Sequence, residues 1–322
     1  MNTKVSIVIV TYNSSRFIME TLDSTLRQTW NEIELIITDD CSSDNTLDLC
    51  RNWINENRER FVRVELLASE VNTGVSENAN RGLHRATGEW IKFMAGDDSF
   101  EPGFIQKNME HIQKNPHIRV LFSQVKVYRD QFQEQNFLKI TPEAIARRHI
   151  FWPERTVESQ YRMLLTHDRI HFTPSAFLHR ETLLSVGGFD KRFRDQEDYA
   201  LWLNLTRNGY KLHYMDGALV NYRMHANALN NTGIPYVVNP NFFKEEDFRK
   251  AYTYPYLPRV IRLKSLYIWY VSQIFRCKWL NKNRKMYLWL LYLLNYYLNP
   301  FQYYIFLKKQ LNPELKENEL YM

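Results

Sequence analysis

The sequence lacks the features by which secreted proteins and proteins with a structural metal site are recognised. Of its 322 residues only three are cysteines, Cys41, Cys50 and Cys277, and their spacing is not that of a metal site. An odd, sparse set of cysteines indicates free thiols in a reducing compartment. The N-terminus, MNTKVSIVIVTYN, has no long apolar core followed by a small-residue cleavage site. We therefore predict no secretory signal and a location on the cytoplasmic side.

Glycine-rich phosphate loops are also missing. Neither a GxxxxGKS or GxxxxGKT loop nor a GxGxxG loop occurs in the chain. Such loops hold phosphates with backbone N–H groups at the start of a helix. The sequence therefore gives no support to a P-loop nucleotidase or to a nicotinamide-binding protein.

Acidic residues are absent from a long C-terminal stretch, Phe248–Asn312. Twelve of the 42 Lys and Arg residues lie there, which leaves 30 in the rest of the chain against 36 Asp and Glu. The formal net charge of +6 therefore averages a mildly acidic body and a strongly basic tail. This asymmetry favours an anionic partner for the tail, either a membrane surface or a nucleic acid.

The first part of the chain alternates strand-like and helix-like segments. Apolar, β-branched runs predict strands, and amphipathic segments with polar N-caps lie between them. The predicted strands are Val5–Tyr12, Glu34–Asp40, Val62–Ala68 and Gly88–Met94. Regular alternation with short connections predicts an α/β fold with a doubly wound, mostly parallel sheet.

The remaining segments complete the predicted organisation. Residues Gln131–Arg169 indicate loops and short helices, Gly187–Asp190 a turn, Asp195–Gly209 a helix and Asn230–Asn241 a linker. We accordingly predict one domain over residues 1–235. Residues 236–322 then form a helical, basic and aromatic C-terminal region.

Polar residues cluster at the ends of three predicted strands, at Thr11–Asn13, Asp39–Asp44 and Gly96–Asp98. Ligands of doubly wound sheets bind at the carboxyl ends of the strands. Asp39 and Asp40 can cap the next helix, or one of them can accept the imide N–H of uracil. In the second case Thr11 and Tyr12 would supply backbone contacts and a ring that stacks on the base.

Two further carboxylate pairs have both a structural and a chemical interpretation. Asp97 and Asp98 can form a solvated turn, or they can bind Mg²⁺ or Mn²⁺ and bridge it to a diphosphate. Glu197 and Asp198 are electrostatically favoured at a helix N-terminus, and either can act as a general base toward an alcohol. His225 is a core or surface histidine, or it helps to hold the metal or the diphosphate.

Five motifs in a fixed order resemble the family 2 glycosyltransferases of GT-A fold. They cover roughly residues 4–228 and read SIVIVTYNSSRFIMETLDSTLRQTW, ELIITDDCSSDNT, NTGVSENANRGLHRATGEWIKFMAGDD, GGFD and QEDYALWLNL. The resemblance implies a GT-A type sheet and inverting transfer of a hexosyl or N-acetylhexosaminyl group from a UDP-sugar. It also implies Mn²⁺ or Mg²⁺ as the cofactor, and a glycan or lipid-linked glycan of bacterial surface polysaccharide synthesis as the acceptor.

The resemblance also implies a role for each matching residue. In the nucleotide-sugar site it places Thr11 and Tyr12, with Asp40 on the base and Asp39 beside it. It gives Asp98 as the direct metal ligand and Asp97 facing ribose and metal. From the residues themselves, we add Asn13 to the nucleotide-sugar site and His225 as a candidate metal contact. Asp198 matches the general base, and Glu197 supports it. Many members carry an aspartate where this chain has Ala95, and this departure weakens the inference about the donor more than the inference of activity.

Two other functions remain open from the residues. A nucleotidyltransferase also uses a sheet with paired aspartates, but it would be expected to have a glycine-rich and basic N-terminal loop. A non-catalytic protein that binds nucleotide sugars or glycans would have no need for a base at Asp198.

The basic tail has a second notable segment, Met286–Leu307, which carries no charge over 22 residues. Its many Tyr and Trp residues prefer the headgroup region of a bilayer. We predict helices that lie on an anionic membrane surface, so that the protein is peripheral on the inner face of the plasma membrane. The alternatives are a membrane span, packing on the catalytic domain and contact within a homodimer. Nucleic-acid binding is not predicted, because no recognised motif accompanies the basic residues.

Overall fold

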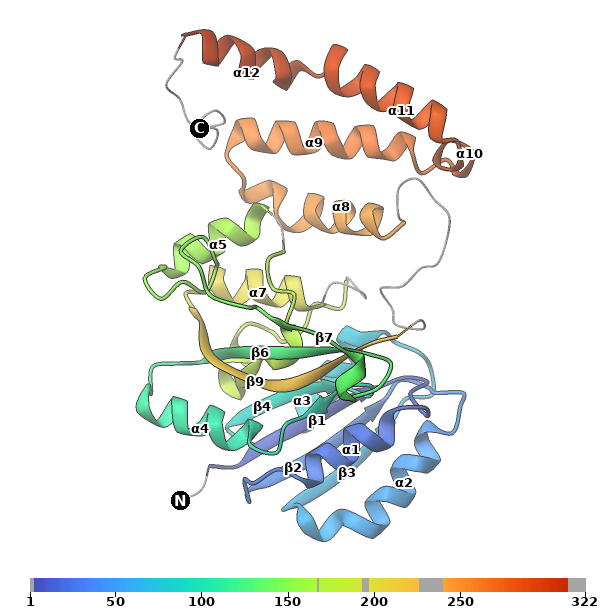
Figure 1. The fold of residues 1–322 in the computed structure, drawn as a ribbon, viewed down its shortest axis with the longest axis vertical. Coiled ribbons are helices and arrows are strands. Elements are labelled where there is room, and N and C mark those ends of the chain that lie inside the picture. The colour runs from blue at the N-terminus through green and yellow to red at the C-terminus, as the bar shows by residue number, and fades with distance from the viewer. Residues whose placement is uncertain (1–2, 167, 193–196, 226–239, 312–322) are drawn as a thin grey trace. The chain divides into compact units, whose positions relative to one another are not determined.

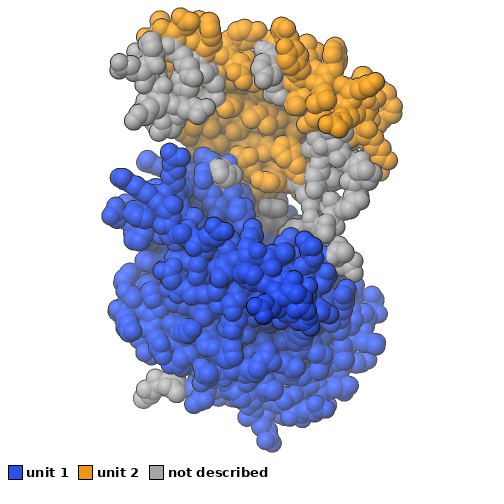
Figure 2. Space-filling model, in the orientation of Figure 1, with its two compact units in different colours: residues 1–225 blue, residues 226–322 orange. Residues whose placement is uncertain are grey.

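The protein is described by a computed structural model that covers residues 3–166, 168–192, 197–225 and 240–311. The chain forms two compact units, residues 1–225 and 226–322, which are coloured separately in Figure 2. The boundary predicted at residue 235, and the predicted linker up to residue 239, lie outside the described residues.

A nine-stranded sheet, counted over the described residues, forms the centre of the first unit (Figure 1). The strand order is β3-β2-β1-β4-β8-β6-β9-β5, and β7 pairs with β6. The strands are β1 (Val5–Thr11), β2 (Ile33–Asp39), β3 (Arg63–Ala68), β4 (Trp90–Ala95), β5 (Ser99–Phe100), β6 (Val120–Arg129), β7 (Phe137–Thr141), β8 (Phe177–His179) and β9 (Leu212–Met224).

The parallel half of the sheet confirms the doubly wound fold predicted from the sequence. Strands β3, β2, β1 and β4 are parallel neighbours, and their ends match the predicted strands to within two residues. β1 and β2 are buried along almost their whole length, as expected for strands that are covered on both faces. The register places Thr11 opposite Asp39 and Val10 opposite Ala95, so the polar segments meet at one edge.

The other half of the sheet mixes strand directions. β8 is antiparallel to both β4 and β6, and β9 is parallel to β6. Because two reversals cancel, β6 and β9 run in the same direction as β1 and β4. The end of β9 therefore lies at the same edge of the sheet as the ends of the first four strands.

Helices cover both faces of this sheet. The first two lie on one face and α3 on the other, as right-handed crossovers require (Figure 1). The helices of this unit are α1 (Ile18–Leu26), α2 (Thr46–Asn57), α3 (Val75–Arg85), α4 (Phe104–Lys114), α5 (Val157–Thr166), α6 (Arg180–Ser185) and α7 (Glu197–Arg207), with short 3₁₀ turns η1 (Arg58–Arg60), η2 (Glu134–Asn136) and η3 (Thr173–Ser175).

The predicted GGFD turn connects α6 to the segment before α7. Gly187 and Gly188 both have positive φ angles, of 87° and 70°. Asn80 of α3 fixes the turn, because its side chain donates to the carbonyl of Phe189 at 2.7 Å and accepts from the Phe189 N–H at 2.9 Å. This motif therefore ties the region before α7 to the parallel half of the sheet.

The second unit is helical, as predicted. Its elements are α8 (Pro240–Tyr252), η4 (Tyr254–Tyr256), α9 (Arg259–Ile274), α10 (Lys278–Lys282), α11 (Arg284–Tyr292), the π-helical turn η5 (Leu293–Tyr297) and α12 (Pro300–Leu311). The uncharged segment 286–307 is thus divided between α11, η5 and α12. Among the described residues, none of the helices has both the length and the apolar character needed to cross a bilayer.

Candidate active site

The first loop of the site follows β1. Thr11 is buried, and its hydroxyl has no hydrogen-bond partner among the described residues. Tyr12 is 49% exposed, so its ring is accessible to a ligand. Asn13 has a positive φ of 49°, its N–H donates to the Ser42 hydroxyl at 2.8 Å, and its side-chain oxygen accepts from the Ser43 N–H at 2.8 Å. Asn13 therefore joins this loop to the loop after β2.

Asp39 and Asp40, at the end of β2, are both almost fully buried. The Asp39 carboxylate accepts from the Ser42 N–H at 2.8 Å and from its hydroxyl at 2.5 Å. The Asp40 carboxylate accepts from the N–H and hydroxyl of Thr73 and, at 2.7 Å, from the N–H of Gly74. Contact of Asp40 with a base would add to these bonds or replace one of them.

The turn after β4 separates the roles of its two aspartates. Asp98 is 2% exposed, and its carboxylate accepts from the backbone N–H of Arg223 at 2.8 Å. Burial, with the charge of Asp97 as the next cause, holds the pKa of Asp98 well above its usual range. The Asp97 side chain is 31% exposed, and its carboxylate lies 3.0 Å from Nε2 of His225.

His225 therefore contacts Asp97, which is the sequence-predicted residue nearest to it. Its ring packs on Phe17 with a centroid distance of 4.8 Å. Its second nitrogen, Nδ1, is buried and has no hydrogen-bond partner within the described chain. An imidazole nitrogen beside a partly exposed carboxylate is a suitable pair of donors for a divalent cation.

Lys92 connects the turn after β4 with the start of α7. It lies in the middle of β4, is fully buried, and donates to the carbonyl oxygens of Pro174 and Ala176, the second at 3.3 Å. Burial lowers its pKa to about 7, while the charges of Asp98 and Asp198 act in the opposite direction. Lys92 is thus within electrostatic reach of both carboxylates.

Tyr222 of β9, like Lys92, is affected by the charges of the neighbouring carboxylates. Burial raises its pKa to about 12, and the charges of Asp98, Asp97 and Asp198 add to this effect. The next residue of β9, Arg223, contacts the aspartate turn directly, through its N–H to Asp98 and its Nε to the Asp97 carbonyl.

Glu197 and Asp198 are the first two residues described in α7, and both are partly exposed. Burial of its carboxyl group holds the pKa of Asp198 well above its usual range, and the charges of Glu197 and Asp168 contribute. The Thr173 hydroxyl and the Lys92 ammonium oppose this rise. The Thr173 bond and the charge of Lys92 thus link Asp198 to β4, which leads into the turn of Asp97 and Asp98.

A metal ion at this site would have few protein donors. Among the described residues, no three His, Cys, Asp or Glu side chains come together as a metal-binding group. Asp97 and His225 offer two adjacent donors, and Asp98 is turned toward the backbone of β9. Mg²⁺ and Mn²⁺ commonly take only one or two protein ligands and complete their shell with diphosphate oxygens and water. The two residues fit that arrangement.

The sequence did not single out Lys92, Arg223 or Tyr222. Lys92 could have been noticed in the sequence, because it is the one charged residue in the strand WIKFMA. Arg223 and Tyr222 gave no such signal, since their positions depend on the pairing of β9 with β6 and β5.

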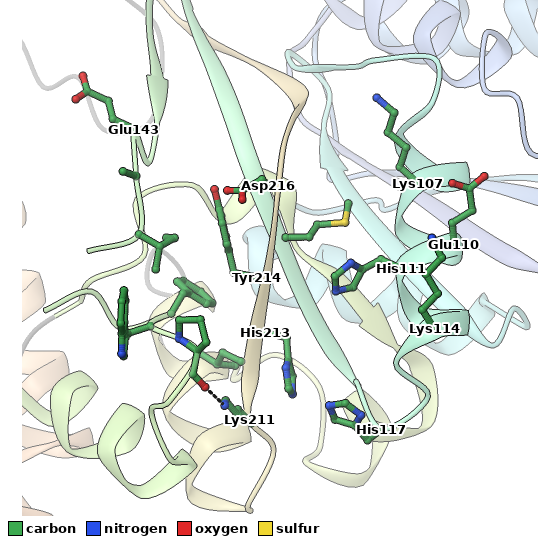
Figure 3. Close-up of a pocket in the computed structure, with 17 residues that line it drawn as sticks. Lys107, Glu110, His111, Lys114, His117, Glu143, Lys211, His213, Tyr214 and Asp216 are labelled. Atoms are coloured by element: carbon green, nitrogen blue, oxygen red, sulfur yellow. Dashed lines mark hydrogen bonds between the residues drawn. The ribbon is translucent and has the colours of Figure 1, made fainter. Parts of the chain in front are cut away.

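A separate hollow lies away from these residues, at the starts of β6 and β9 (Figure 3). Its volume is about 980 Å³. The basic residues that line it are Lys107, His111, Lys114, His117, Lys211 and His213. Because β6 and β9 run parallel to β4, their starts lie at the opposite edge of the sheet from the site of Asp97 and Asp98.

Solved structures show the fold. The chain matches the structure of S. aureus TarS 1–349 in complex with UDP-GlcNAc with a TM-score of 0.58 and 19% sequence identity. The match covers 95% of this chain and 81% of that chain. The mannosyltransferase PcManGT from Pyrobaculum calidifontis, solved with GDP-Man and Mn²⁺, matches with a TM-score of 0.50 and 15% identity over 90% of this chain and 84% of that one. The predicted GT-A type sheet is confirmed.

Relatives in sequence are glycosyltransferases. The Escherichia coli protein named UDP-Glc:alpha-D-GlcNAc-diphosphoundecaprenol beta-1,3-glucosyltransferase WfaP is 29% identical, over 75% of this chain and 82% of its own length. The amylovoran biosynthesis glycosyltransferase AmsB of Erwinia amylovora is 27% identical, over 68% of this chain and 69% of its own. The family model described as "Glycosyl transferase family 2" matches residues 6–186, which is more than half of the chain. The chain therefore belongs to glycosyltransferase family 2.

Proposed function

We propose that the protein is an inverting glycosyltransferase that moves a sugar from a UDP-sugar to a hydroxyl group of a glycan or lipid-linked glycan. The observation that carries the proposal is that the segment Thr173–Ala176 links Asp198 to β4, the strand that leads into the turn of Asp97 and Asp98. The Thr173 hydroxyl hydrogen-bonds Asp198, and Lys92 of β4 donates to the carbonyls of Pro174 and Ala176. A site for a nucleoside diphosphate and a base for an acceptor are then within reach of one another. Family membership favours sugar transfer over nucleotidyl transfer and over a non-catalytic binding protein.

In this proposal, Asp97 and His225 hold the divalent cation, Mn²⁺ or Mg²⁺. This division of roles differs from the one expected from the sequence, which made Asp98 the direct ligand. The reason is that Asp98 is buried and bonded to the Arg223 N–H, whereas Asp97 is partly exposed and lies against His225. When bound, the cation stabilises the negative charge that develops on the departing diphosphate. Asp98 then supports the turn that presents Asp97.

Asp198 is the proposed general base. A sugar hydroxyl is too weakly acidic to be ionised at neutral pH, so its proton must be taken as the new bond forms. Because the pKa of Asp198 is raised, its carboxylate binds a proton more strongly than an ordinary aspartate does, which makes it a better base for this hydroxyl. The hydroxyl oxygen attacks the anomeric carbon, the bond from that carbon to the diphosphate breaks, and the proton passes to Asp198. Glu197 raises the pKa of Asp198 through its charge and thereby supports it.

The nucleotide is proposed to bind over the ends of β1 and β2. Tyr12 offers its exposed ring to the base, Thr11 offers backbone groups and an unpaired hydroxyl, and Asp39 and Asp40 lie beside the base. The choice of UDP is supported by WfaP, whose name gives UDP-Glc as the donor, and by the TarS structure, which contains UDP-GlcNAc. A hexosyl or N-acetylhexosaminyl donor is consistent with both.

The second unit is proposed to hold the enzyme at the inner face of the plasma membrane. Exposed aromatic residues of this unit include Trp279 and Trp289, which are 63% and 61% exposed. The cations of the stretch Phe248–Asn312 would interact with anionic lipid headgroups. Attachment of this kind fits an acceptor carried on a lipid, such as the diphosphoundecaprenol acceptor in the name of WfaP, and a role in cell-surface polysaccharide synthesis.

The direct test replaces the proposed base. Wild-type protein is given a panel of UDP-sugars with Mn²⁺, and release of UDP is measured with and without glycan acceptors. We expect Asp198→Asn to lower the rate by about a hundredfold or more while the affinity for UDP stays unchanged. The control, Asp48→Asn, removes an exposed carboxylate of α2 and should keep full activity. Substantial turnover by Asp198→Asn would remove Asp198 from the role of base.

A further inference from the structure

Arg223, the next-to-last residue of β9, makes contacts that the proposed chemistry does not require. Its side chain is 1% exposed, although it carries a charge. Nε donates to the backbone carbonyl of Asp97 at 2.8 Å. The two terminal nitrogens donate to the carbonyl of Asp130 and to the carboxylate of Glu20. One guanidinium therefore joins β9 to the aspartate turn, to the turn after β6 and to α1.

Two aromatic rings pack against this guanidinium. Its central carbon lies 4.3 Å from the ring centroid of Phe17 and 3.9 Å from that of Phe132. A guanidinium can stack between two rings while its edge donates to several acceptors, which an ammonium group cannot do. The site is therefore specific for arginine.

The ring of Phe17 is shared with His225, the proposed metal ligand, whose ring centroid is 4.8 Å away. Phe17 also lies in the loop that begins with Thr11 and Tyr12 and leads into α1. Arg223 and His225, the proposed metal ligand, thus both pack on one ring of the nucleotide loop.

The main chain of the same residue contacts the second aspartate. The N–H of Arg223 donates to the Asp98 carboxylate at 2.8 Å, and two residues later His225 reaches the Asp97 carboxylate at 3.0 Å. A stretch of three residues therefore contacts both aspartates of the turn. A shift of Arg223 would move the donors on Asp97 and His225 relative to each other.

We propose that Arg223 is a positioning residue that couples binding of the divalent cation to binding of the nucleoside diphosphate. The inference rests on the proposed roles of Asp97 and His225 as metal ligands and of the β1–α1 loop in nucleotide binding. Arg223 does not contact either ligand. It fixes Asp97, His225 and the β1–α1 loop in one arrangement. The site for the cation and the site for the nucleotide are therefore formed together, so that binding of one ligand favours binding of the other.

The coupling is measured by calorimetry with UDP as the probe, in the presence and absence of Mn²⁺. For the wild-type protein we expect Mn²⁺ to tighten UDP binding by a factor on the order of 10 to 100. In Arg223→Lys, which keeps the charge, this factor should fall to about threefold or less, while UDP affinity without Mn²⁺ changes little. The control, Arg129→Lys, alters an exposed arginine at the end of the neighbouring strand β6 and should keep the wild-type factor.

The outcomes separate this inference from the proposed function. If Mn²⁺ does not alter UDP affinity in the wild-type protein, the proposed metal site itself is wrong. If the wild type shows the coupling and a folded Arg223→Lys retains it, the inference is overturned. Should Arg223→Lys not fold, Phe132→Leu decides, because it removes one face of the stack and leaves the arginine. Reduced coupling in Phe132→Leu supports the inference, and an unchanged factor overturns it.

Discussion

Lys92 shows how a single buried side chain shapes the chemistry of this site. It is fully buried on β4, the strand that leads into the turn carrying Asp98, and its charge acts on Asp198 at the start of α7. Its ammonium opposes the rise in the pKa of Asp198 that burial causes. The charge on Lys92 therefore influences how much of Asp198 is ionised at a given pH.

This gives a prediction about pH dependence. A general base is active as the carboxylate, so the catalytic rate should rise with pH through the pKa of Asp198. Because that pKa is raised, the rise should occur above the range of an ordinary aspartate. Lys92→Met removes the opposing charge, so the pKa of Asp198 should rise further and the acid limb of the rate profile should move to higher pH.

The measurement is the turnover rate against pH for the wild type, Lys92→Met and Lys92→Arg, with circular dichroism to verify folding. Lys92→Arg keeps a positive charge and should move the acid limb less than Lys92→Met. An acid limb that stays in place in folded Lys92→Met would show that Lys92 does not act on the base.

The sequence indicated which residues belong to the candidate site, but not how they are arranged within it. The carboxylates at the strand ends and His225 were identified, because parallel strands bring their ends to one edge. From the sequence, Asp98 was predicted to be the direct metal ligand and Asp97 to face ribose and metal. The pairing of β9 adds contacts that the sequence does not show: the Arg223 N–H donates to Asp98, and His225 lies against Asp97. These contacts are the reason for the different roles proposed above.

At the scale of elements, the GGFD turn illustrates how a short motif positions a helix. Gly187 and Gly188 are neighbours with similar positive φ angles, but their surroundings differ. A Cβ atom on Gly188 would lie 2.5 Å from the side-chain oxygen of Asn80 and 3.0 Å from Cδ2 of Leu83. At Gly187, nothing in the described part of the chain lies within 4 Å of such an atom.

The pair forms a matched experiment. Alanine at either position carries a similar backbone penalty of about 1–2 kcal/mol in the left-handed region. Gly188→Ala must in addition push Asn80 away from Phe189, so its free energy of unfolding should be lower than that of Gly187→Ala by about 1–3 kcal/mol. Urea denaturation of both variants measures this difference. Equal stabilities would mean that the close packing of Gly188 on α3 is unimportant.

The elements differed in how far the sequence revealed them. β1, β2 and β4 are long buried runs of apolar residues, and their pattern alone predicted them. β7 was not predicted within the segment 131–169, because its first three residues are exposed and it is formed by pairing with β6. Such pairing depends on contacts between segments and leaves little periodicity in the strand itself.

At the scale of the whole molecule, the chain combines a catalytic unit with a basic, aromatic one. The basic unit has its acidic partners in α8, where Asp247 pairs with Arg276 and Glu246 with Arg249. Other cations, such as the exposed Lys278 and Lys285, lie beyond α8 in a stretch without acidic residues. A surface of this composition is suited to anionic lipid headgroups.

Membrane association is therefore predicted to depend on these cations. The full chain with Lys278→Gln and Lys285→Gln should bind anionic phospholipid vesicles more weakly by about 1 kcal/mol for each residue, which is about fivefold each. Added salt should weaken wild-type binding as well. The matched control, Lys107→Gln with Lys114→Gln, removes two exposed lysines of the first unit and should have no effect.

Vesicle sedimentation measures this binding. If the wild type binds neutral and anionic vesicles equally, or if the two pairs of variants behave alike, the basic unit is not the membrane anchor. Binding of the second unit to another copy of the chain would instead appear as a concentration-dependent dimer in solution.

The central claim is that one site performs a direct displacement, with Asp198 as the base and the diphosphate as the leaving group. The stereochemistry of the product tests it most directly. An α-linked UDP-sugar that supports turnover in the donor panel is incubated with the wild-type protein, and the anomeric configuration of the freshly formed product is followed by proton NMR. We expect the β configuration, because a single displacement inverts the anomeric carbon. A product that is α when first formed would contradict it.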